Sequence, residues 1–257
     1  MSSTNAAAIA ASVVERLGGR YSTELGIDLD ADDEEVERWF LAATLFGARI
    51  SAQIAARTFH ELERAGIRRI ADADKFSRDD LIAILDAGGY ARYDFRTATR
   101  LEDLAKVVTE RYDGTVAEFG RRYTDPGELE GALGELPGWG AVTVGLFLRE
   151  LRGVWPGAQP PLDARAAEAA RHLGLIAPGT KGELARITHL AELAGCDVRD
   201  LESALVRLAH AHRRMADCPG CRACVALEAA EPALDPRRPE RPPDPRRTAG
   251  DSARRRR

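Results

Sequence analysis

The stretch Leu136-Pro137-Gly138-Trp139-Gly140-Ala141-Val142-Thr143 decides the fold prediction for this chain. It joins two segments with helical apolar spacing, one opened by Asp125-Pro126 and one that starts at Ala141. Its two glycines permit a sharp turn, so that the backbone lies close to whatever is outside. The amides that start the second helix then point outward without helical partners, an arrangement that suits a phosphate without a basic side chain. The alternative is an ordinary tight turn with Trp139 in the core.

Helical patterns continue on both sides of this turn. Helix starts are expected at Asp32 or Asp33, at Ser51 and at Ser77, where Asp80 completes a capping arrangement. Further helices are expected over 95–112, 125–133, 141–151, 164–173, 181–194 and 198–212. No alternating segment is long enough to predict a strand. The sequence therefore predicts an all-α fold.

The charge distribution limits the kind of partner. The net charge is −4, but residues 235–257 hold nine Arg against four acids, which leaves about −9 on the rest of the chain. An acidic body argues against a wide electropositive track for DNA, so DNA binding would depend on a local basic face and on backbone amides. From about Glu231 onward the chain is rich in Pro, Arg and Asp and almost lacks apolar side chains, and residues 226–257 are therefore predicted to form a disordered tail.

Targeting and membrane signals are not found in the sequence. The segment 1–32 starts with an Ala-rich stretch that predicts a helix, since it lacks the basic leader and long apolar region of a signal peptide. No apolar run reaches the roughly 20 residues that a membrane span needs. We therefore expect a cytoplasmic protein without membrane contact.

Four cysteines suggest metal ligation. Cys218, Cys221 and Cys224 fall within seven residues, and Cys196 lies upstream. In a chain without an export signal, clustered cysteines favour a metal site over disulfides. Reduced thiols without a metal remain the alternative.

The hairpin and its flanking landmarks resemble the helix-hairpin-helix DNA glycosylases of the endonuclease III type. The Leu-Pro-Gly-x-Gly turn is followed by Pro161-Leu162-Asp163-Ala164-Arg165, which looks like the family's Pro-Val-Asp-Thr-His loop. Upstream, residues 40–51 look like the family's apolar helix and its Ser-x-Gln loop, and residues 85–90 resemble its Gly-Tyr stretch. The cysteines fall where the family carries its iron–sulfur loop. The resemblance covers residues 33–225.

The resemblance implies a fold and a DNA surface. It implies two helical subdomains with a DNA-binding cleft between them, one from about Ala52 to Thr143 and one combining the N-terminal helices with those after Asp163. A monomer would bind double-stranded DNA at the nucleoid. The DNA-binding residues would be Leu136, Gly138, Trp139, Gly140, Ala141, Val142 and Thr143 of the hairpin, together with Arg49.

The chemistry that the resemblance implies centres on Asp163. A carboxylate can stabilise the positive charge that develops on the sugar as the base leaves, or deprotonate an attacking water. Asp163 also directly precedes a helix, so N-capping is its ordinary alternative role, and both roles can hold at once.

Two departures from the family pattern affect this chemistry. Bifunctional members carry a Schiff-base lysine where this chain has Val142, and none of its three lysines is close in sequence. Monofunctional members also lack this lysine and use an activated water, so the resemblance implies a monofunctional glycosylase. Arg49 replaces a Gln that enters the gap left by a flipped base, and an arginine can fill the same space. Tyr90, Tyr93 and Trp139 are either base-stacking residues or core.

The cysteine spacing also departs from the family. The family spacing is Cys-x6-Cys-x2-Cys-x5-Cys, whereas this chain has Cys218-x2-Cys221-x2-Cys224 with no later cysteine. A 4Fe–4S cluster usually takes four thiolates, so Cys196 would have to supply the fourth. His210 or His212 can alternatively complete a zinc or cluster site.

Three functions are compatible with these features. The first is base excision repair by a monofunctional DNA N-glycosylase that uses Asp163. The second is a non-catalytic DNA-binding or damage-recognition protein that keeps the helix-hairpin-helix fold. The third is a helical protein-interaction module without a DNA role.

Overall fold

The computed structural model describes residues 3–48, 50–90, 93–212, 215 and 218. Over these residues the chain forms α-helices and a 3₁₀ helix but no β-strand, which confirms the all-α prediction. The elements are α1 Ser3–Leu17, α2 Tyr21–Glu24, α3 Asp33–Phe46, α4 Ala52–Arg64, η1 Ile70–Lys75, α5 Arg78–Ala87, α6 Asp94–Arg111, α7 Ala117–Arg122, α8 Pro126–Gly134, α9 Ala141–Glu150, α10 Ala164–His172, α11 Glu183–Ala194 and α12 Val198–Ala211. Within the same ranges, no helix has both the length and the apolar content to cross a membrane.

The helices begin at side chains that satisfy their first free amides. Asp32 accepts a hydrogen bond from the Glu35 amide at 3.1 Å, and Ser51 accepts one from the Ile54 amide. Ser77 and Asp80 form the predicted reciprocal capping pair, in which each side chain accepts from the other's amide. These caps confirm the predicted helix starts.

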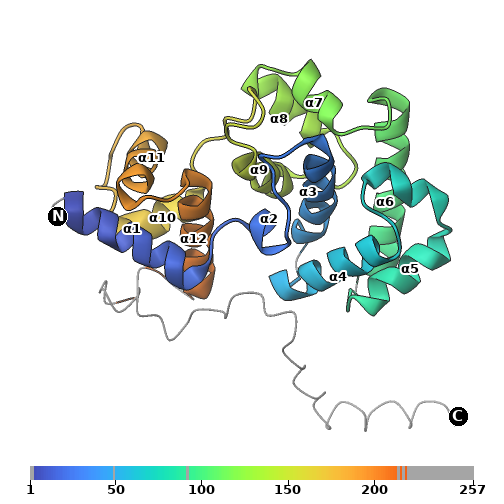
Figure 1. Ribbon diagram of the computed structural model, residues 1–257, viewed down its shortest axis with the longest axis horizontal. Coiled ribbons are helices and arrows are strands. Elements are labelled where there is room, and N and C mark those ends of the chain that lie inside the picture. The colour runs from blue at the N-terminus through green and yellow to red at the C-terminus, as the bar shows by residue number, and fades with distance from the viewer. Residues whose placement is uncertain (1–2, 49, 91–92, 213–214, 216–217, 219–257) are drawn as a thin grey trace, which may run out of the picture.

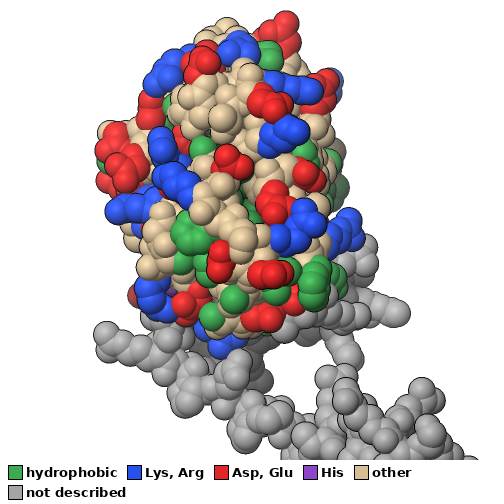
Figure 2. Space-filling model, turned by 90° about the vertical axis from the view of Figure 1, so that its right-hand side faces the viewer, with side chains coloured by type: hydrophobic (Ala, Val, Ile, Leu, Met, Phe, Trp, Pro, Cys, Tyr) green, Lys and Arg blue, Asp and Glu red, His purple; other side chains and the backbone are tan. Residues whose placement is uncertain are grey.

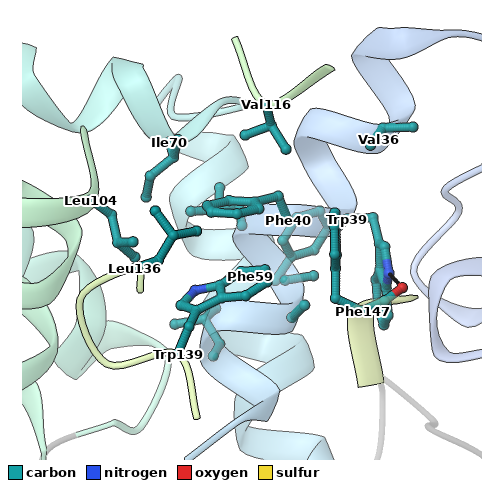
Figure 3. Packing of buried hydrophobic residues seen from close by; sticks show 14 of the residues in the cluster. Val36, Trp39, Phe40, Phe59, Ile70, Leu104, Val116, Leu136, Trp139 and Phe147 are labelled. Atoms are coloured by element: carbon teal, nitrogen blue, oxygen red, sulfur yellow. Dashed lines mark hydrogen bonds between the residues drawn. The ribbon is translucent and has the colours of Figure 1, made fainter. Parts of the chain in front are cut away.

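The large lobe, residues 21–158, surrounds α3. Trp39 and Phe40 of α3 are fully buried, and Trp139 stacks on Phe40 at 4.3 Å between ring centroids. Figure 3 shows Phe147 of α9 packed against the same helix. The Trp39 indole donates a hydrogen bond to the Phe147 carbonyl at 3.2 Å. An aromatic core thus fixes α3 against α9 and against the turn that precedes α9.

The small lobe consists of α1 with α10, α11 and α12. In Figure 1 these helices lie together at one end of the molecule, although α1 is separated from α10 by the whole large lobe in sequence. The apolar stripe of α1 explains this pairing, since Ala6, Ala10, Val13 and Leu17 recur at helical spacing and are buried against α11 and α12. The expectation that an N-terminal helix joins the helices after Asp163 agrees with this arrangement.

The expected division between subdomains needs one correction. We expected the large subdomain to start near Ala52, with the earlier helices in the other subdomain. Instead α3 is the central helix of the large lobe, because it packs on α4, α7 and α9 and buries ten consecutive residues. Only α1 crosses to the small lobe.

Ion pairs connect the two lobes. Arg152 of the large lobe pairs with Glu202 of the small lobe at 3.0 Å, and Glu202 is fully buried. A second pair joins the buried Arg199 at 2.8 Å to Asp30, whose side chain is about half exposed. Charged groups that are buried in pairs are costly to separate, so the contact between Arg152 and Glu202 fixes how the lobes meet.

Candidate functional site

The segment 136–143, which is predicted to form the hairpin, makes a turn between α8 and α9 that depends on Gly138. Gly138 has a φ of +75°, a backbone conformation that favours glycine. A Cβ at this position would lie 2.3 Å from Nε of Arg100 in α6, so a larger residue would displace that side chain. The turn therefore requires Gly138 both for its φ and for its close contact with α6.

The start of α9 presents backbone amides without a side-chain cap. Gly140 is the N-cap residue, and no described side chain accepts from the amides that follow it. Ala141 is exposed, and Val142 is 70% exposed despite being apolar. The first amides of a helix carry partial positive charge and lack helical partners. The structure thus gives α9 the uncapped, exposed start that phosphate binding needs.

The segment that follows α3 lies against this helix start. A Cβ on Gly47 would come within 2.1 Å of Oγ1 of Thr143, and the Thr143 side chain is buried. Gly47 belongs to the loop predicted to carry Arg49, which lies outside the described residues. The two segments predicted to face DNA, far apart in sequence, are therefore neighbours in the structure.

The aromatic residues considered for base stacking belong mainly to the core. Trp139 is 3% exposed and donates an indole hydrogen bond to Thr44 at 3.2 Å. Tyr90 is buried and donates its hydroxyl to the Leu45 carbonyl at 3.0 Å, and burial raises the pKa of Tyr90 to about 12. Tyr93 is half-buried against the same core. Trp139 is thus corrected from a DNA-contacting side chain to a core residue, and Leu136 is buried beside it.

Arginines lie near the hairpin, but the surrounding surface has mixed charge. Arg100 contacts the turn, and burial, together with the nearby Arg96, lowers the pKa of its guanidinium. Arg57 lies beside the Gly89 backbone. Figure 2 shows acidic and basic side chains interspersed over one face of the large lobe. The local basic groups therefore supplement the backbone amides, and that face shows no broad positive track.

The lysines offer no obvious substitute for the family's Schiff-base amine. Val142 holds the position that the resemblance assigns to that lysine. Lys75 pairs with Asp72 at 2.8 Å, and Lys106 lies 4.0 Å from Glu110 on its own helix. These contacts engage both amines in local ion pairs.

Asp163 is the N-cap of α10. Its carboxylate accepts from the amides of Arg165 at 2.8 Å and Ala166 at 3.3 Å, so the capping role is real. Its own amide donates to Oε1 of Glu202 at 2.9 Å. Arg152, which pairs with Glu202, also donates to the Pro161 carbonyl at 3.2 Å. The loop before α10 is thus held by a buried charged pair, while the Asp163 side chain stays half-exposed.

Asp163 and the hairpin are held by different parts of the molecule. The hairpin precedes α9, whereas Arg152, which anchors the Asp163 loop, follows α9. The ten residues of α9 extend about 15 Å. The described hydrogen bonds of Asp163 stay within its own helix and the Arg152–Glu202 pair, so they do not join it to the hairpin.

The predicted four-cysteine ligand set does not fit the structure. Cys196 directly precedes α12, whereas Cys218 lies within 4.8 Å of His212 at the other end of this helix, so the 14 residues of α12 separate the two cysteines by about 20 Å. Burial, and then the nearby Asp200 and Asp197, raise the pKa of the Cys196 thiol, which disfavours the thiolate that binds metals. Cys196 is therefore corrected to a half-buried thiol outside any shared site with Cys218. Cys221 and Cys224 lie outside the described residues.

Cys218 instead lies beside two histidines. His172 ends α10, His212 follows α12, and their ligand atoms and Sγ of Cys218 all lie within 4.8 Å of one another. The cysteine spacing pointed to His212 as one possible ligand, but no sequence signal pointed to His172. Arg100, Gly47 and Glu202 were also not predicted, because each acts through a contact made in the folded chain.

No protein-family profile matches this chain, and no curated protein sequence matches it. The resemblance to the endonuclease III type therefore remains a hypothesis that rests on the quoted residues.

Proposed function

We propose that this protein binds double-stranded DNA as a monomer and acts in base excision repair, as a monofunctional DNA N-glycosylase that uses Asp163. The observation that carries the proposal is the uncapped start of α9 after the Gly138 turn. A cytoplasmic location at the nucleoid is part of the same proposal.

The hairpin can hold a DNA backbone without a basic track. The free amides at the start of α9 offer donors and positive partial charge to a phosphate oxygen. Gly140 places no side chain between these amides and a ligand. Arg100 adds a cation at the neighbouring turn. This combination suits a chain whose body is acidic, because the contact depends on backbone geometry and on few charges.

Asp163 is the proposed catalytic residue. When the bond between the sugar and the base breaks, positive charge develops on the sugar, and water adds there to leave a hydroxyl and the free base. The Asp163 carboxylate would stabilise this charge or accept a proton from the water. Val142 cannot form a Schiff base, so strand cleavage through such an intermediate is not part of the proposal.

The substitution Gly140→Asp tests the phosphate contact. An Asp side chain at an N-cap accepts from the free amides and brings negative charge to the place proposed for phosphate. A Cβ at Gly140 meets nothing within 4 Å, so the fold should be retained. We expect duplex affinity to fall about tenfold or more, equivalent to about 1.4 kcal/mol. Fluorescence anisotropy with labelled duplex at several salt concentrations measures it.

Two further variants serve as controls. Gly131→Asp adds the same charge on exposed α8, where a Cβ also meets nothing within 4 Å, and should leave affinity nearly unchanged. Gly140→Asn occupies the amides without charge and should give an intermediate loss. Wild-type affinity for Gly140→Asp would contradict the phosphate contact. Absence of duplex binding by the wild-type protein would instead favour a helical protein-interaction module.

A non-catalytic DNA-binding protein is the second candidate. Two observations favour it: Asp163 is already engaged as a helix cap, and Val142 replaces the family's lysine. This candidate predicts the same duplex binding but no release of free base, so an assay of base release distinguishes the two.

A further inference from the structure

Three metal-binding side chains meet at one end of the small lobe. His172 comes from the last turn of α10, His212 from the end of α12, and Cys218 from the segment beyond it. The two imidazole rings lie 5.3 Å apart between centroids and are nearly perpendicular. All three side chains are half-buried. Three separate segments of the chain therefore bring nitrogen and sulfur ligands to one place.

His212 has the tautomer that a metal ligand requires. Its Nδ1 lies 2.7 Å from the Leu208 carbonyl oxygen. A carbonyl only accepts hydrogen bonds, so Nδ1 carries the proton and a neutral ring keeps the lone pair on Nε2. A hydrogen bond from the other ring nitrogen to a backbone carbonyl commonly orients a metal-binding histidine.

The helix ends around this group also favour a cation. Both α10 and α12 end here, and a helix C-terminus carries partial negative charge from its unpaired carbonyls. Two such ends stabilise a positive ion placed between them. A lone histidine at a helix end would gain from one dipole only.

The spacing of the ligand atoms suits a single ion. Tetrahedral zinc with bonds of about 2.0 Å to nitrogen and 2.3 Å to sulfur places its ligand atoms about 3.5 Å apart. Separations within 4.8 Å need only small side-chain rotations to reach this geometry. The thiolates of a four-iron cluster bind different irons at different corners, which demands wider spacing and four cysteines. Nitrogen and thiolate donors together are typical of zinc.

We propose that His172, His212 and Cys218 bind one zinc ion, which joins the ends of α10 and α12 to the segment after α12. Three protein ligands leave the fourth tetrahedral position to water or to a further donor. The ion would stabilise the lobe that carries Asp163 at the other end of α10. This site replaces the four-cysteine cluster and does not depend on DNA binding.

Metal analysis of the full-length wild-type protein tests the proposal first. We expect about one zinc per chain and neither iron nor acid-labile sulfide. X-ray absorption at the zinc edge should show nitrogen neighbours together with sulfur. Iron with labile sulfide, a zinc shell of four sulfurs, or no zinc bound when zinc is supplied would each overturn the site. These measurements need no variant, so they hold even if a substitution unfolds the chain.

Matched substitutions then assign the ligands. His172→Ala, His212→Ala and Cys218→Ser should each weaken zinc affinity about tenfold or more, measured by competition with a chromophoric chelator. Two controls in the same lobe should keep wild-type affinity: His189→Ala, whose side chain is exposed on α11, and Cys196→Ser at the far end of α12. Zinc affinity that survives all three ligand substitutions, or that is lost with Cys196→Ser, would contradict this ligand set.

Discussion

The hydrophobic cores of the two lobes differ in the side chains that they contain. The large-lobe core contains ring pairs, among them Phe40 with Trp139 and Tyr112 with Phe119. The hydrophobic core of the small lobe, over the described residues, consists of Ala, Val, Leu, Ile and Met side chains without a Phe, Tyr or Trp ring. Aromatic side chains bury more area each and gain from ring contacts, so apolar packing alone stabilises the large lobe more strongly.

The two lobes also carry different kinds of candidate functional groups. The hairpin exposes mainly backbone, and Trp139 behind it ties that backbone to the aromatic core. The small lobe carries Asp163 and the group of His172, His212 and Cys218, and its contact with the large lobe includes buried charges. The large lobe therefore supplies a rigid surface, and the small lobe depends on polar contacts for its position.

The largest expected effect is that of Trp139→Ala. The substitution removes the stack on Phe40 and the hydrogen bond to Thr44 behind the hairpin. We expect the free energy of unfolding to fall by about 3–5 kcal/mol, measured by urea denaturation. Trp139→Phe retains the stack and should cost about 1 kcal/mol. Equal, small losses for both would mean that the aromatic core does not support the turn.

Glu202→Gln should have a smaller effect, at the junction between the lobes. The substitution keeps the shape but leaves the buried Arg152 guanidinium without its carboxylate partner. We expect a loss of about 2–3 kcal/mol. The control Glu183→Gln breaks a more exposed pair with Arg171 and should cost under about 1 kcal/mol. Similar losses for the two variants would contradict a junction held by buried charge.

The smallest effect on stability is expected for Val142→Lys. Val142 is 70% exposed, so the free energy of unfolding should change by no more than about 0.5 kcal/mol. The reactivity toward abasic DNA should change instead. Borohydride should trap a covalent adduct between the variant and DNA that contains abasic sites, whereas the wild-type protein should form no adduct. An adduct with the wild-type protein would show that another amine reaches the sugar. No adduct with the variant would mean that the start of α9 does not lie at the sugar.

The local features of the fold were predictable from the sequence. Ser77 with Asp80 and Asp125 with Pro126 mark helix starts through their own neighbours, and the structure has helices there. The turn between α8 and α9 was recognisable because Gly138 and Gly140 have their effect within a few residues. The place of α3 was not predictable, because the side on which an amphipathic helix packs depends on partners far along the chain.

Parts of the candidate site depend on tertiary contacts that leave no local pattern. His172 is an ordinary residue of α10 until α12 brings His212 beside it. Cys196 appeared to be a fourth ligand because it was the only thiol left, and only the length of α12 excludes it. The local sequence around Asp163 is the same whether Asp163 caps a helix, activates a water that attacks the sugar, or does both.

Release of free base is the measurement that tests the proposed function most directly. Asp163→Asn is the informative variant, since Asn caps a helix about as well as Asp but carries no negative charge. Asp125→Asn is its matched control, because Asp125 caps α8 through amides two and three residues ahead, as Asp163 caps α10.

The assay follows free base released from duplexes that contain damaged or mismatched bases. We expect release by the wild-type protein and by Asp125→Asn, and a loss of about 100-fold or more in Asp163→Asn at nearly unchanged duplex affinity and stability. No release by the wild-type protein, or equal release by Asp163→Asn, would contradict a glycosylase that uses Asp163.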